Sequence, residues 1–534
     1  MTRIGSKTLS TRTPNARVSI GTDKVAYTIP DQAEIDAQFE ALKKRNASRI
    51  RSGSKVVAVQ GLGFVGVAVA AAIAGARDEK GGPSYFVIGI DIAEPSSYWK
   101  IAKLAKGESP IAAPDPELED LINEAVNKEG NLAVTASERA YSLADAIVVD
   151  VPLDVRDRFA LDPNDIELNL KSFENAIRAI GRNMKADALV LVETTVPVGA
   201  CEKIVFPLLK EERERRGLRG RVFLAHAYER VMPGPGYMAS IRRFWRSFAG
   251  IDRDSSARAR EFLSSFIDTA SYPLRELEDT KSSELAKLLE NSYRAANIAF
   301  IYEWTLLAED IGINLFDVIE SIRVRKGTHD NIRFPGFGVG GYCLTKDQLL
   351  AQWGASRLFA SDVKLNVTLN ALDINARMPL HTFELAKELL SGKIGGKKVA
   401  ICGVAYLPEV GDTRNSPTAI LVERMIKSGA DVVVHDPCVK TWPEKPGLRV
   451  FQDMKECIKG ADCVIFAVPH RAYLELSAQA LLKYRLRSGA AIVDAQNIIS
   501  DDKAARLRGA GYRLAGVGKG HWRKKGYQWA KERA

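Results

Sequence analysis

Cysteine is scarce in this chain. Its 534 residues include only six cysteines, at Cys201, Cys343, Cys402, Cys438, Cys457 and Cys463. None of them forms a CxxC pair or shows the spacing of zinc ligands. A disulfide scaffold requires a far higher density of cysteine, so the count predicts a protein of the reducing cytoplasm without a metal site.

Long apolar runs are also missing. The longest, Val65–Ala76, is much shorter than the about 20 residues that cross a bilayer. Residues 1–21 are polar and basic and lack the apolar core of a secretory signal. The sequence therefore predicts no membrane insertion.

Charge of one sign is in modest excess. The 76 Lys and Arg residues against 66 Asp and Glu residues give a net charge of +10, and no known nucleic-acid module stands out. We therefore expect no nucleic-acid partner, and the positive bias suits a substrate that carries two phosphates. The 46% hydrophobic and 27% charged residues are ordinary for a soluble globular protein of two to four domains.

The first 52 residues look like an extension that precedes the main domains. Within it, Asp31–Arg51 is charged and carries Ile35, Phe39 and Leu42 at helical spacing. The pattern favours a helix that lies on the body of the protein, and the alternative is an arm that binds a partner.

Strands alternate with helices in two separate regions. Residues 53–275 contain a helix at Val67–Ala76 and predicted strands at Val56–Gln60, Phe86–Ile90, Ala146–Val151, Leu189–Glu193 and Val222–Ala225. Residues 391–534 repeat the pattern, with a helix at Pro417–Ser428 and strands at Lys398–Cys402, Asp431–His435, Cys463–Ala467 and Ala491–Val493. Alternation of this kind predicts a parallel, doubly wound sheet in each region.

Residues 276–390 have a different character, because long helical periodicities dominate them. The predicted helices are Ser283–Ile311, Leu315–Arg323, Asp347–Trp353 and Val363–Leu390. We therefore expect an α/β protein in which two Rossmann-like doubly wound domains are joined by a central helical domain. The basic tail, residues 521–534, is predicted to be frayed or helical.

A glycine motif stands between the first strand and the first helix of the main chain. In the run Gly61-Leu-Gly63-Phe64-Val65-Gly66, the first glycine allows a tight turn, the second lets backbone approach a pyrophosphate, and the third permits close helix packing. Asp91 ends the next strand, where a carboxylate binds the ribose hydroxyls and disfavours a 2′-phosphate. The motif, Phe64 and Val65 included, predicts an NAD site.

A second glycine-dense loop, residues 337–347, delivers Cys343 beside Lys346 and Asp347. A nearby cation promotes the thiolate that a nucleophilic cysteine needs. A buried structural cysteine is an equally good interpretation of the loop by itself. Lys287 and Asn291, four residues apart on a predicted helix, form either an oxyanion-binding pair or a solvated face.

Taken together, these motifs resemble the nucleotide-sugar 6-dehydrogenases, the family of UDP-glucose, GDP-mannose and UDP-N-acetylhexosamine dehydrogenases. The similarity runs from about Lys55 to Gly518. The matching stretches are GLGFVGVAVA (61–70), LAKGESPI (104–111), ADAIVVDVP (144–152), ETTVPVGA (193–200), YERVMPG (228–234), ELAKLLENSYRAANIAFIYE (284–303), FGVGGYCLTKD (337–347), GVAYLPEVGDTRNSPT (403–418) and VHDP (434–437).

The resemblance implies an NAD-binding domain at 53–275, a helical dimerisation domain at 276–390 and a nucleotide-sugar-binding domain at 391–534, after an extension at 1–52. It further implies a four-electron oxidation of the sugar C6 alcohol to an acid, in a cytoplasmic homodimer or larger homo-oligomer of polysaccharide biosynthesis. Cys343 would be the nucleophile that passes through a thiohemiacetal and a thioester.

The resemblance also implies roles for the neighbouring positions. Lys287 and Asn291 would stabilise oxyanions and contact substrate, and Asp347 would act as a base or orient water. Thr195 would hold a water beside the cofactor, and Glu229 would assist hydrolysis. The remaining implied contacts are Glu229, Arg230 and Gly340 with substrate and Arg414 with cofactor.

Three positions depart from the family pattern. The family commonly has VPTP where this chain has Val151-Pro152-Leu153-Asp154, and AFKP where it has a Leu407 in place of lysine. The GVGGYC run resembles the N-acetylhexosamine and mannose branches, whereas the LTKD run that follows it resembles the UDP-glucose branch. We expect a UDP-hexose or a UDP-N-acetylhexosamine as substrate. A two-electron hydroxyacid-type dehydrogenase and a non-catalytic nucleotide-sugar-binding protein on the same fold are the alternatives.

Overall fold

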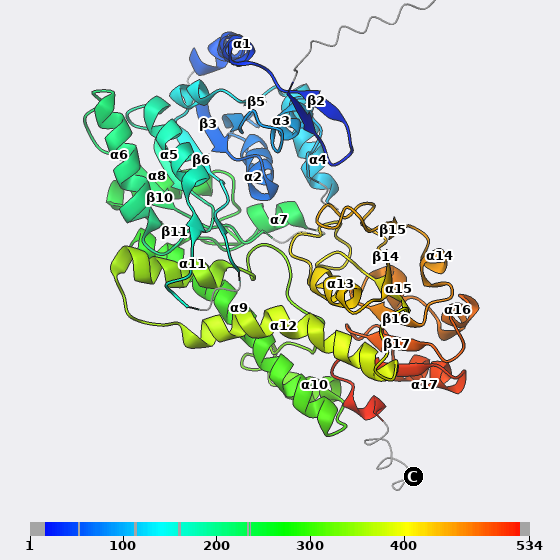
Figure 1. The fold of residues 1–534 in the computed structure, drawn as a ribbon. Coiled ribbons are helices and arrows are strands. Elements are labelled where there is room, and N and C mark those ends of the chain that lie inside the picture. The colour runs from blue at the N-terminus through cyan, green and yellow to red at the C-terminus, as the bar shows by residue number, and fades with distance from the viewer. Residues whose placement is uncertain are drawn as a thin grey trace, which may run out of the picture. The chain divides into compact units, whose positions relative to one another are not determined.

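The computed structural model describes residues 17–51, 54–111, 115–158, 162–231, 234 and 236–523 (Figure 1). The start of the extension and the end of the basic tail, about which the sequence made predictions, lie outside these ranges. The chain forms two compact units: residues 1–153, 170–195 and 199–284 make the first, and residues 154–169, 196–198 and 285–534 make the second.

The first unit is built on an eight-stranded sheet with the strand order β12-β11-β10-β9-β6-β3-β4-β5. Its strands are β3 (Lys55–Gln60), β4 (Tyr85–Ile90), β5 (Leu132–Thr135), β6 (Ala146–Val149), β9 (Leu189–Val192), β10 (Phe223–His226), β11 (Ser247–Gly250) and β12 (Arg275–Glu276). All neighbours run parallel except β10 and β11, which are antiparallel. The predicted doubly wound sheet is therefore confirmed, with a reversed edge that the sequence did not indicate.

Helices and a small hairpin surround this sheet. The helices of the first unit are α1 (Gln32–Arg51), α2 (Phe64–Ala74), α3 (Tyr98–Leu104), α4 (Pro116–Asn123), α5 (Lys171–Asn183), α6 (Phe206–Arg215), α7 (Tyr237–Arg242) and α8 (Arg253–Ser264). The hairpin pairs β1 (Val18–Ile20) with β2 (Ala26–Thr28). Nine of the eleven residues of α2 are buried, as expected for a helix that is apolar on every side.

The second unit contains a six-stranded parallel sheet with the order β15-β14-β13-β16-β17-β18. Its strands are β13 (Lys398–Cys402), β14 (Asp431–His435), β15 (Val450–Phe451), β16 (Cys463–Phe466), β17 (Ala491–Asp494) and β18 (Arg513–Gly516). Five helices belong to the same region: α13 (Pro417–Lys427), α14 (Met454–Ile458), α15 (Arg471–Leu474), α16 (Ala478–Lys483) and α17 (Asp501–Gly509).

Helices dominate the middle of the chain, as the sequence predicted. They are α9 (Thr280–Asp310), α10 (Leu315–Arg323), α11 (Asp347–Trp353) and α12 (Asn366–Leu389). The short pair β7 (Asp154–Val155) and β8 (Leu168–Asn169) belongs to the second unit, although it interrupts the first unit in sequence. The two-Rossmann architecture with a helical centre is thus confirmed, and the boundaries at 276 and 391 stay predictions.

Both sheets share one connection pattern. In each, the chain builds outward from the central strand, β3 or β13, and then crosses back to the other side of that strand at β6 or β16. Open α/β sheets bind ligands where the strand order reverses, at the carboxyl ends of the strands. The fold therefore points to one binding position beyond β3 and a second beyond β13.

Candidate active site

The glycine motif forms the turn between β3 and α2. Gly61 has a φ of +94°, and a Cβ at this position would lie 2.7 Å from the carbonyl oxygen of Asp150. A Cβ on Gly66 would lie 1.9 Å from the carbonyl oxygen of Gly61, whereas one on Gly63 would meet no atom within 4 Å. The turn therefore excludes side chains where backbone packs and leaves open space where a phosphate would lie.

The helix after this turn begins earlier than the sequence indicated. The structure starts α2 at Phe64 rather than at Val67, so that Phe64 and Val65 occupy its first turn and are partly buried. Gly66 lies inside the helix. It must be a glycine because the backbone of Gly61 occupies the place that a side chain would take. The N-terminus of α2 therefore follows the glycine turn directly, and the dipole of this end of a helix favours an anion.

Asp91 follows β4 and is almost fully buried. Its carboxylate accepts hydrogen bonds from the amides of Leu62 at 3.0 Å and Ile92 at 2.8 Å, and it forms an ion pair with Lys100 at 3.1 Å. Asp91 and the glycine turn line one cavity of about 920 Å³ together with Asp150. The cavity and the turn fit a dinucleotide.

Asp150 is the unusual group of this cavity. Its side chain is buried, and neither of its carboxyl oxygens has a hydrogen-bond partner. Burial, together with the carboxyl groups of Glu193 and Glu229, raises the pKa of Asp150 well above its usual range, and Arg246 offsets this only in part. Arg246 pairs instead with Glu193, at the end of β9. A bound cofactor would supply the partners that Asp150 lacks within the protein.

Two further predicted residues of the first unit are tied to their own loop. Glu229 accepts a hydrogen bond from the amide of Val231. Arg230 donates to the hydroxyl of Tyr228 at 2.8 Å and to the carbonyl of Trp245, and its guanidinium lies 5.0 Å from the centre of the Tyr228 ring. These contacts fix the position of Arg230 in the loop after β10. Thr195 is partly buried after β9.

The other predicted catalytic residues belong to the second unit. Lys287 and Asn291 stand one turn apart on α9, and both are buried. Asn291 donates a hydrogen bond from Nδ2 to Asp347 Oδ2 at 2.7 Å, and Lys346 Nζ lies 3.1 Å from Asp347 Oδ1. Asp347 therefore has one neutral and one cationic donor on its two oxygens.

Cys343 lies in the loop just before α11 and is partly buried. Its carbonyl accepts hydrogen bonds from the amides of Lys346 at 3.1 Å and Asp347 at 3.0 Å, so the loop turns tightly onto the cluster described above. The side chains of Tyr342, Tyr406 and Arg414 lie close enough to interact electrostatically with Cys343. The sequence itself places Tyr342 and Asp347 near Cys343, and only the fold adds Tyr406 and Arg414.

Arg414 has a close partner of its own. Its guanidinium binds the carboxylate of Asp412 through two nitrogens, with an Nη2–Oδ2 distance of 2.6 Å. Burial disfavours the charge of Arg414, but the hydrogen bond to Asp412, with smaller contributions from Tyr406 and Cys343, raises the pKa of its guanidinium overall. Arg414 thus provides a permanent cation beside the Cys343 loop.

The glycines of the Cys343 loop are required by their neighbours. Gly341 has a φ of +83°, and a Cβ on it would lie 2.8 Å from the ring of Tyr406. A Cβ on Gly340 would lie 2.9 Å from the carbonyl oxygen of Asn415. The side-chain amide of Asn415 donates a hydrogen bond from Nδ2 to the Gly341 carbonyl oxygen at 3.1 Å. The loop therefore packs directly against the segment after β13.

Asp154, which replaces a family residue, also acts on this loop. It forms an ion pair with Arg158 at 2.8 Å. The Arg158 guanidinium lies 5.4 Å from the centre of the Tyr342 ring and donates a hydrogen bond to Thr345. Sequence reasoning missed Arg158 because about 190 positions separate it from Thr345, and no local pattern signals such a contact.

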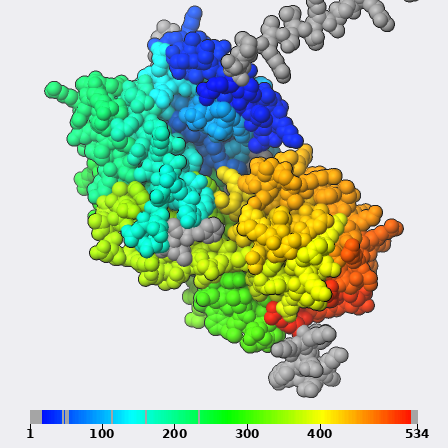
Figure 2. Space-filling model, in the orientation of Figure 1, coloured from blue at the N-terminus to red at the C-terminus, as the bar shows by residue number. Residues whose placement is uncertain are grey.

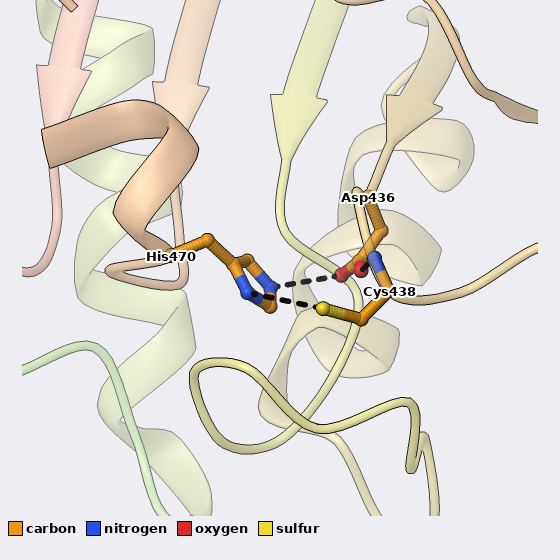
Figure 3. Close-up of side chains that lie close together, drawn as sticks. All are labelled: Asp436, Cys438 and His470. Carbon is orange, nitrogen blue, oxygen red and sulfur yellow. Dashed lines mark hydrogen bonds and ion pairs between the residues drawn. The ribbon is translucent and has the colours of Figure 1, made fainter. Parts of the chain in front are cut away.

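The turn after β13 resembles the glycine turn of the first unit. Gly403 has a φ of +107°, and Asp436, at the end of β14, accepts hydrogen bonds from the amides of Val404 at 2.7 Å and Ala405 at 3.0 Å. His470 Nε2 lies 3.2 Å from the same carboxylate, and Cys438 Sγ lies 3.8 Å from His470 Nδ1 (Figure 3).

This trio could hold a metal ion by the spacing of its ligand atoms. The atoms are already engaged, however. Asp436 also accepts hydrogen bonds from the amides of Cys438 and Val439, and His470 Nδ1 accepts one from the amide of Glu409 at 3.0 Å. The trio therefore fixes the loops around the second binding position by hydrogen bonds.

Comparison with known proteins agrees with this geometry. Residues 55–246 match the NAD binding domain of the UDP-glucose/GDP-mannose dehydrogenase family, residues 281–377 match its central domain, and residues 400–501 match its UDP binding domain. The chain belongs to this family. It is accordingly an NAD-dependent dehydrogenase of nucleotide sugars, with a UDP binding domain beyond β13.

Individual relatives cover nearly the whole chain. The UDP-N-acetyl-D-mannosamine dehydrogenase of Methanocaldococcus jannaschii is 30% identical over 450 residues, which is 84% of this chain and 93% of the relative. The structure of NDP-N-acetyl-D-galactosaminuronic acid dehydrogenase from Methanosarcina mazei Go1 has a TM-score of 0.72 at 32% identity and covers 88% of this chain and 96% of its own. The structure of UDP-D-ManNAc dehydrogenase from Pyrococcus horikoshii has a TM-score of 0.73 at 29% identity, and the match covers 87% of this chain and 100% of that structure's chain.

The described helices include no candidate membrane span. None of them combines the length and the apolar character that a membrane span requires.

Proposed function

We propose that this enzyme oxidises the C6 alcohol of a UDP-linked N-acetylhexosamine to a carboxylate, through a covalent intermediate on Cys343. The observation that carries the proposal is the cluster around the Cys343 loop, where Asn291, Lys346 and Asp347 form one buried hydrogen-bonded network. The sugar is inferred from relatives, because proteins named for UDP-N-acetyl-D-mannosamine and NDP-N-acetyl-D-galactosaminuronic acid share about a third of their residues with this chain.

The reaction takes two oxidations and one hydrolysis. NAD⁺, held at the glycine turn and Asp91, would supply the hydride acceptor for both oxidations. In the first, the C6 hydroxyl gives its proton to a basic group, and the alcohol becomes an aldehyde. Cys343 then adds to the aldehyde through its sulfur, and the second oxidation converts the resulting thiohemiacetal into a thioester.

Hydrolysis then regenerates the thiol. Water attacks the thioester carbonyl, the carbon–sulfur bond breaks, and the acid leaves with the new oxygen. Asp347 would accept a proton from this water, while Lys287 and Asn291 would stabilise the oxyanions that form at C6. Thr195 and Glu229 are proposed to position the water, Arg230 and Gly340 to contact the sugar nucleotide, and Arg414 to contact the cofactor.

The decisive measurement is the ratio of NADH formed to product formed. A panel of UDP- and GDP-linked sugars with NAD⁺ should yield two NADH per uronate, with the fastest turnover for a UDP-N-acetylhexosamine. One NADH per molecule oxidised would instead support the two-electron alternative. Tight binding of a UDP-sugar without any reduction of NAD⁺ would support the non-catalytic alternative.

Replacement of the nucleophile tests the covalent step separately. Cys343→Ser should lose at least about 1,000-fold in acid production, because an alcohol is a far weaker nucleophile at neutral pH than a thiol. Mass spectrometry of the variant should show no thioester on the protein. Cys457→Ala, on α14 in the core of the second unit, is the control and should keep the wild-type ratio of NADH to acid. Undiminished acid production by Cys343→Ser would exclude the assignment.

The same proposal includes a homodimer formed through α9. This helix exposes an apolar stripe at roughly four-residue spacing, and such patches mark association surfaces. The stripe consists of Leu285, Leu289, Tyr293, Phe300, Trp304, Leu307 and Ile311. A second copy of the chain is the partner that we propose for it.

A further inference from the structure

The N-terminal extension lines part of the cofactor cavity. Arg17, Gln32, Ile35 and Asp36 stand in the wall of the same cavity that contains the glycine turn and Asp91. The match to the NAD binding domain begins at residue 55, so these four residues precede the matched domain. The dinucleotide fold therefore does not supply the whole cavity by itself.

The extension stands at the adenosine end of this cavity. In dinucleotide folds, the carboxylate that ends the second strand binds the adenosine ribose, and here that carboxylate is Asp91. Ile92 and Glu94, which follow it directly, line the cavity, as do Ser137 and Arg139 after β5. Arg139 in turn contacts the extension helix α1, so α1 lies beside the loops that flank an adenine in this fold.

Helix α1 is held on the first unit by one buried apolar face and by contacts with Arg139. Ile35, Phe39 and Leu42 are all buried, as their helical spacing predicted. The guanidinium of Arg139 lies 4.5 Å from the centre of the Phe39 ring and forms an ion pair with Glu40. The helix therefore packs on the body of the first unit (Figures 1 and 2), which confirms that interpretation over a free arm.

The β1–β2 hairpin fixes the segment that follows Asp91. Ser19 is fully buried, its hydroxyl donates to the carbonyl of Pro95 at 2.7 Å, and it accepts from the amide of Trp99 at 3.0 Å. Asp23 pairs with Lys103 on α3 at 2.9 Å. The hairpin thus holds the loop between β4 and α3, which forms the ribose side of the cavity.

We propose that residues 17–51 form the outer wall of the adenosine pocket, and that their docking and the binding of NAD⁺ reinforce each other. Ile35 offers an apolar surface to the flat adenine ring, while Arg17, Gln32 and Asp36 offer polar groups to its edge and to the ribose. Coupling is reciprocal: a ligand that binds better when the extension is docked must also hold the extension in place.

Binding measurements with the full-length protein test the first half of the proposal. Calorimetry should show that Ile35→Ala and Arg17→Ala each raise the Kd for NAD⁺ and for ADP about five- to tenfold, which corresponds to one lost contact of about 1 kcal/mol. Arg17 is exposed, so its variant cannot fail through a lost core. Lys43→Ala, on the exposed side of α1 and outside the cavity wall, is the matched control and should leave both Kd values unchanged.

Hydrogen exchange tests the second half. NAD⁺ and ADP should each slow exchange of the amides of residues 32–44 severalfold, whereas nicotinamide mononucleotide, which lacks the adenosine, should not. The amides of α17, in the second unit, serve as the control: slower exchange there as well would indicate a general stabilisation of the protein. The proposal is overturned if the Kd for ADP stays within twofold of wild type in both variants, or if ADP leaves exchange in α1 unchanged.

Discussion

Buried carboxyl groups set the electrostatics of the first unit. Asp150 has no hydrogen-bond partner, Glu193 is neutralised by Arg246, and Glu284 accepts backbone amides from Gly199 at 2.5 Å and Cys201 at 2.8 Å. Burial raises the pKa of Glu284 to about 7, although these hydrogen bonds oppose the shift. Asp150 and Glu284, whose pKa values are raised by burial, therefore keep their protons at a pH where an exposed carboxylate would already be charged.

Glu284 should make folding stability depend on pH between about 4.5 and 7. Its folded pKa of about 7 exceeds the ordinary glutamate value of 4.5, so the folded state holds this proton more tightly than the unfolded state does. The resulting stabilisation is complete below pH 4.5 and is lost as pH rises through 7, and its size is about 3 kcal/mol. Denaturant unfolding at pH 5 and pH 8 measures the difference.

The isosteric variant isolates this contribution. Glu284→Gln cannot ionise, so its stability should fall less between pH 5 and pH 8 than that of the wild type. The side-chain carbonyl oxygen of the glutamine can still accept a hydrogen bond from one of the two backbone N–H groups. The free energy of unfolding that this substitution costs should therefore be small and nearly independent of pH. Parallel pH profiles of the two proteins would contradict the assignment.

Among the elements, α2 depends most directly on its glycines. Gly66→Ala would place a methyl group 1.9 Å from the carbonyl oxygen of Gly61, and backbone cannot move aside without opening the turn. We expect a loss of about 1–3 kcal/mol or more in stability and a large rise in the Kd for NAD⁺.

The other end of the same helix provides the control. Gly75 has a φ of −76°, and a Cβ there would approach a methyl group of Leu121 at 3.0 Å, which a side-chain rotation relieves. Gly75→Ala should therefore change the Kd for NAD⁺ less than twofold. Thermal melting and calorimetry of both variants distinguish a local effect on the turn from general weakening of α2.

At the scale of the whole molecule, the exposed face of α9 predicts the oligomeric state. Leu289→Glu combined with Leu307→Glu should convert the dimer to a monomer, because two buried charges per chain would lack partners in the interface. Sedimentation velocity measures the change. Ile426→Glu, an exposed position on α13, is the control and should remain a dimer. A wild-type protein that sediments as a monomer would refute the proposed dimer.

Local patterns in the sequence predicted much of this protein. The strands β3, β4, β13 and β14 and the helices α10 and α11 have nearly the predicted bounds. Short continuous apolar runs mark strands that are buried on both faces, and a period of 3.6 marks helices with one buried face. The short strands β5, β11 and β18 were not predicted, although the equally short β6, β9, β10, β16 and β17 were. The glycine turn and the Cys343 loop could be predicted from the sequence, because a backbone that approaches a ligand or another segment closely requires glycines at fixed positions.

Contacts between distant segments depended on the tertiary structure. The sequence by itself determined the fold class, the position of the dinucleotide turn and the identity of the Cys343 cluster. Only the fold placed Arg158 against Tyr342, left the Asp150 carboxyl buried without a partner, and set Ile35 in the wall of the cofactor cavity. The physical reason is that such contacts join residues far apart in the chain, and no periodicity within either segment encodes the partner that packing brings to it.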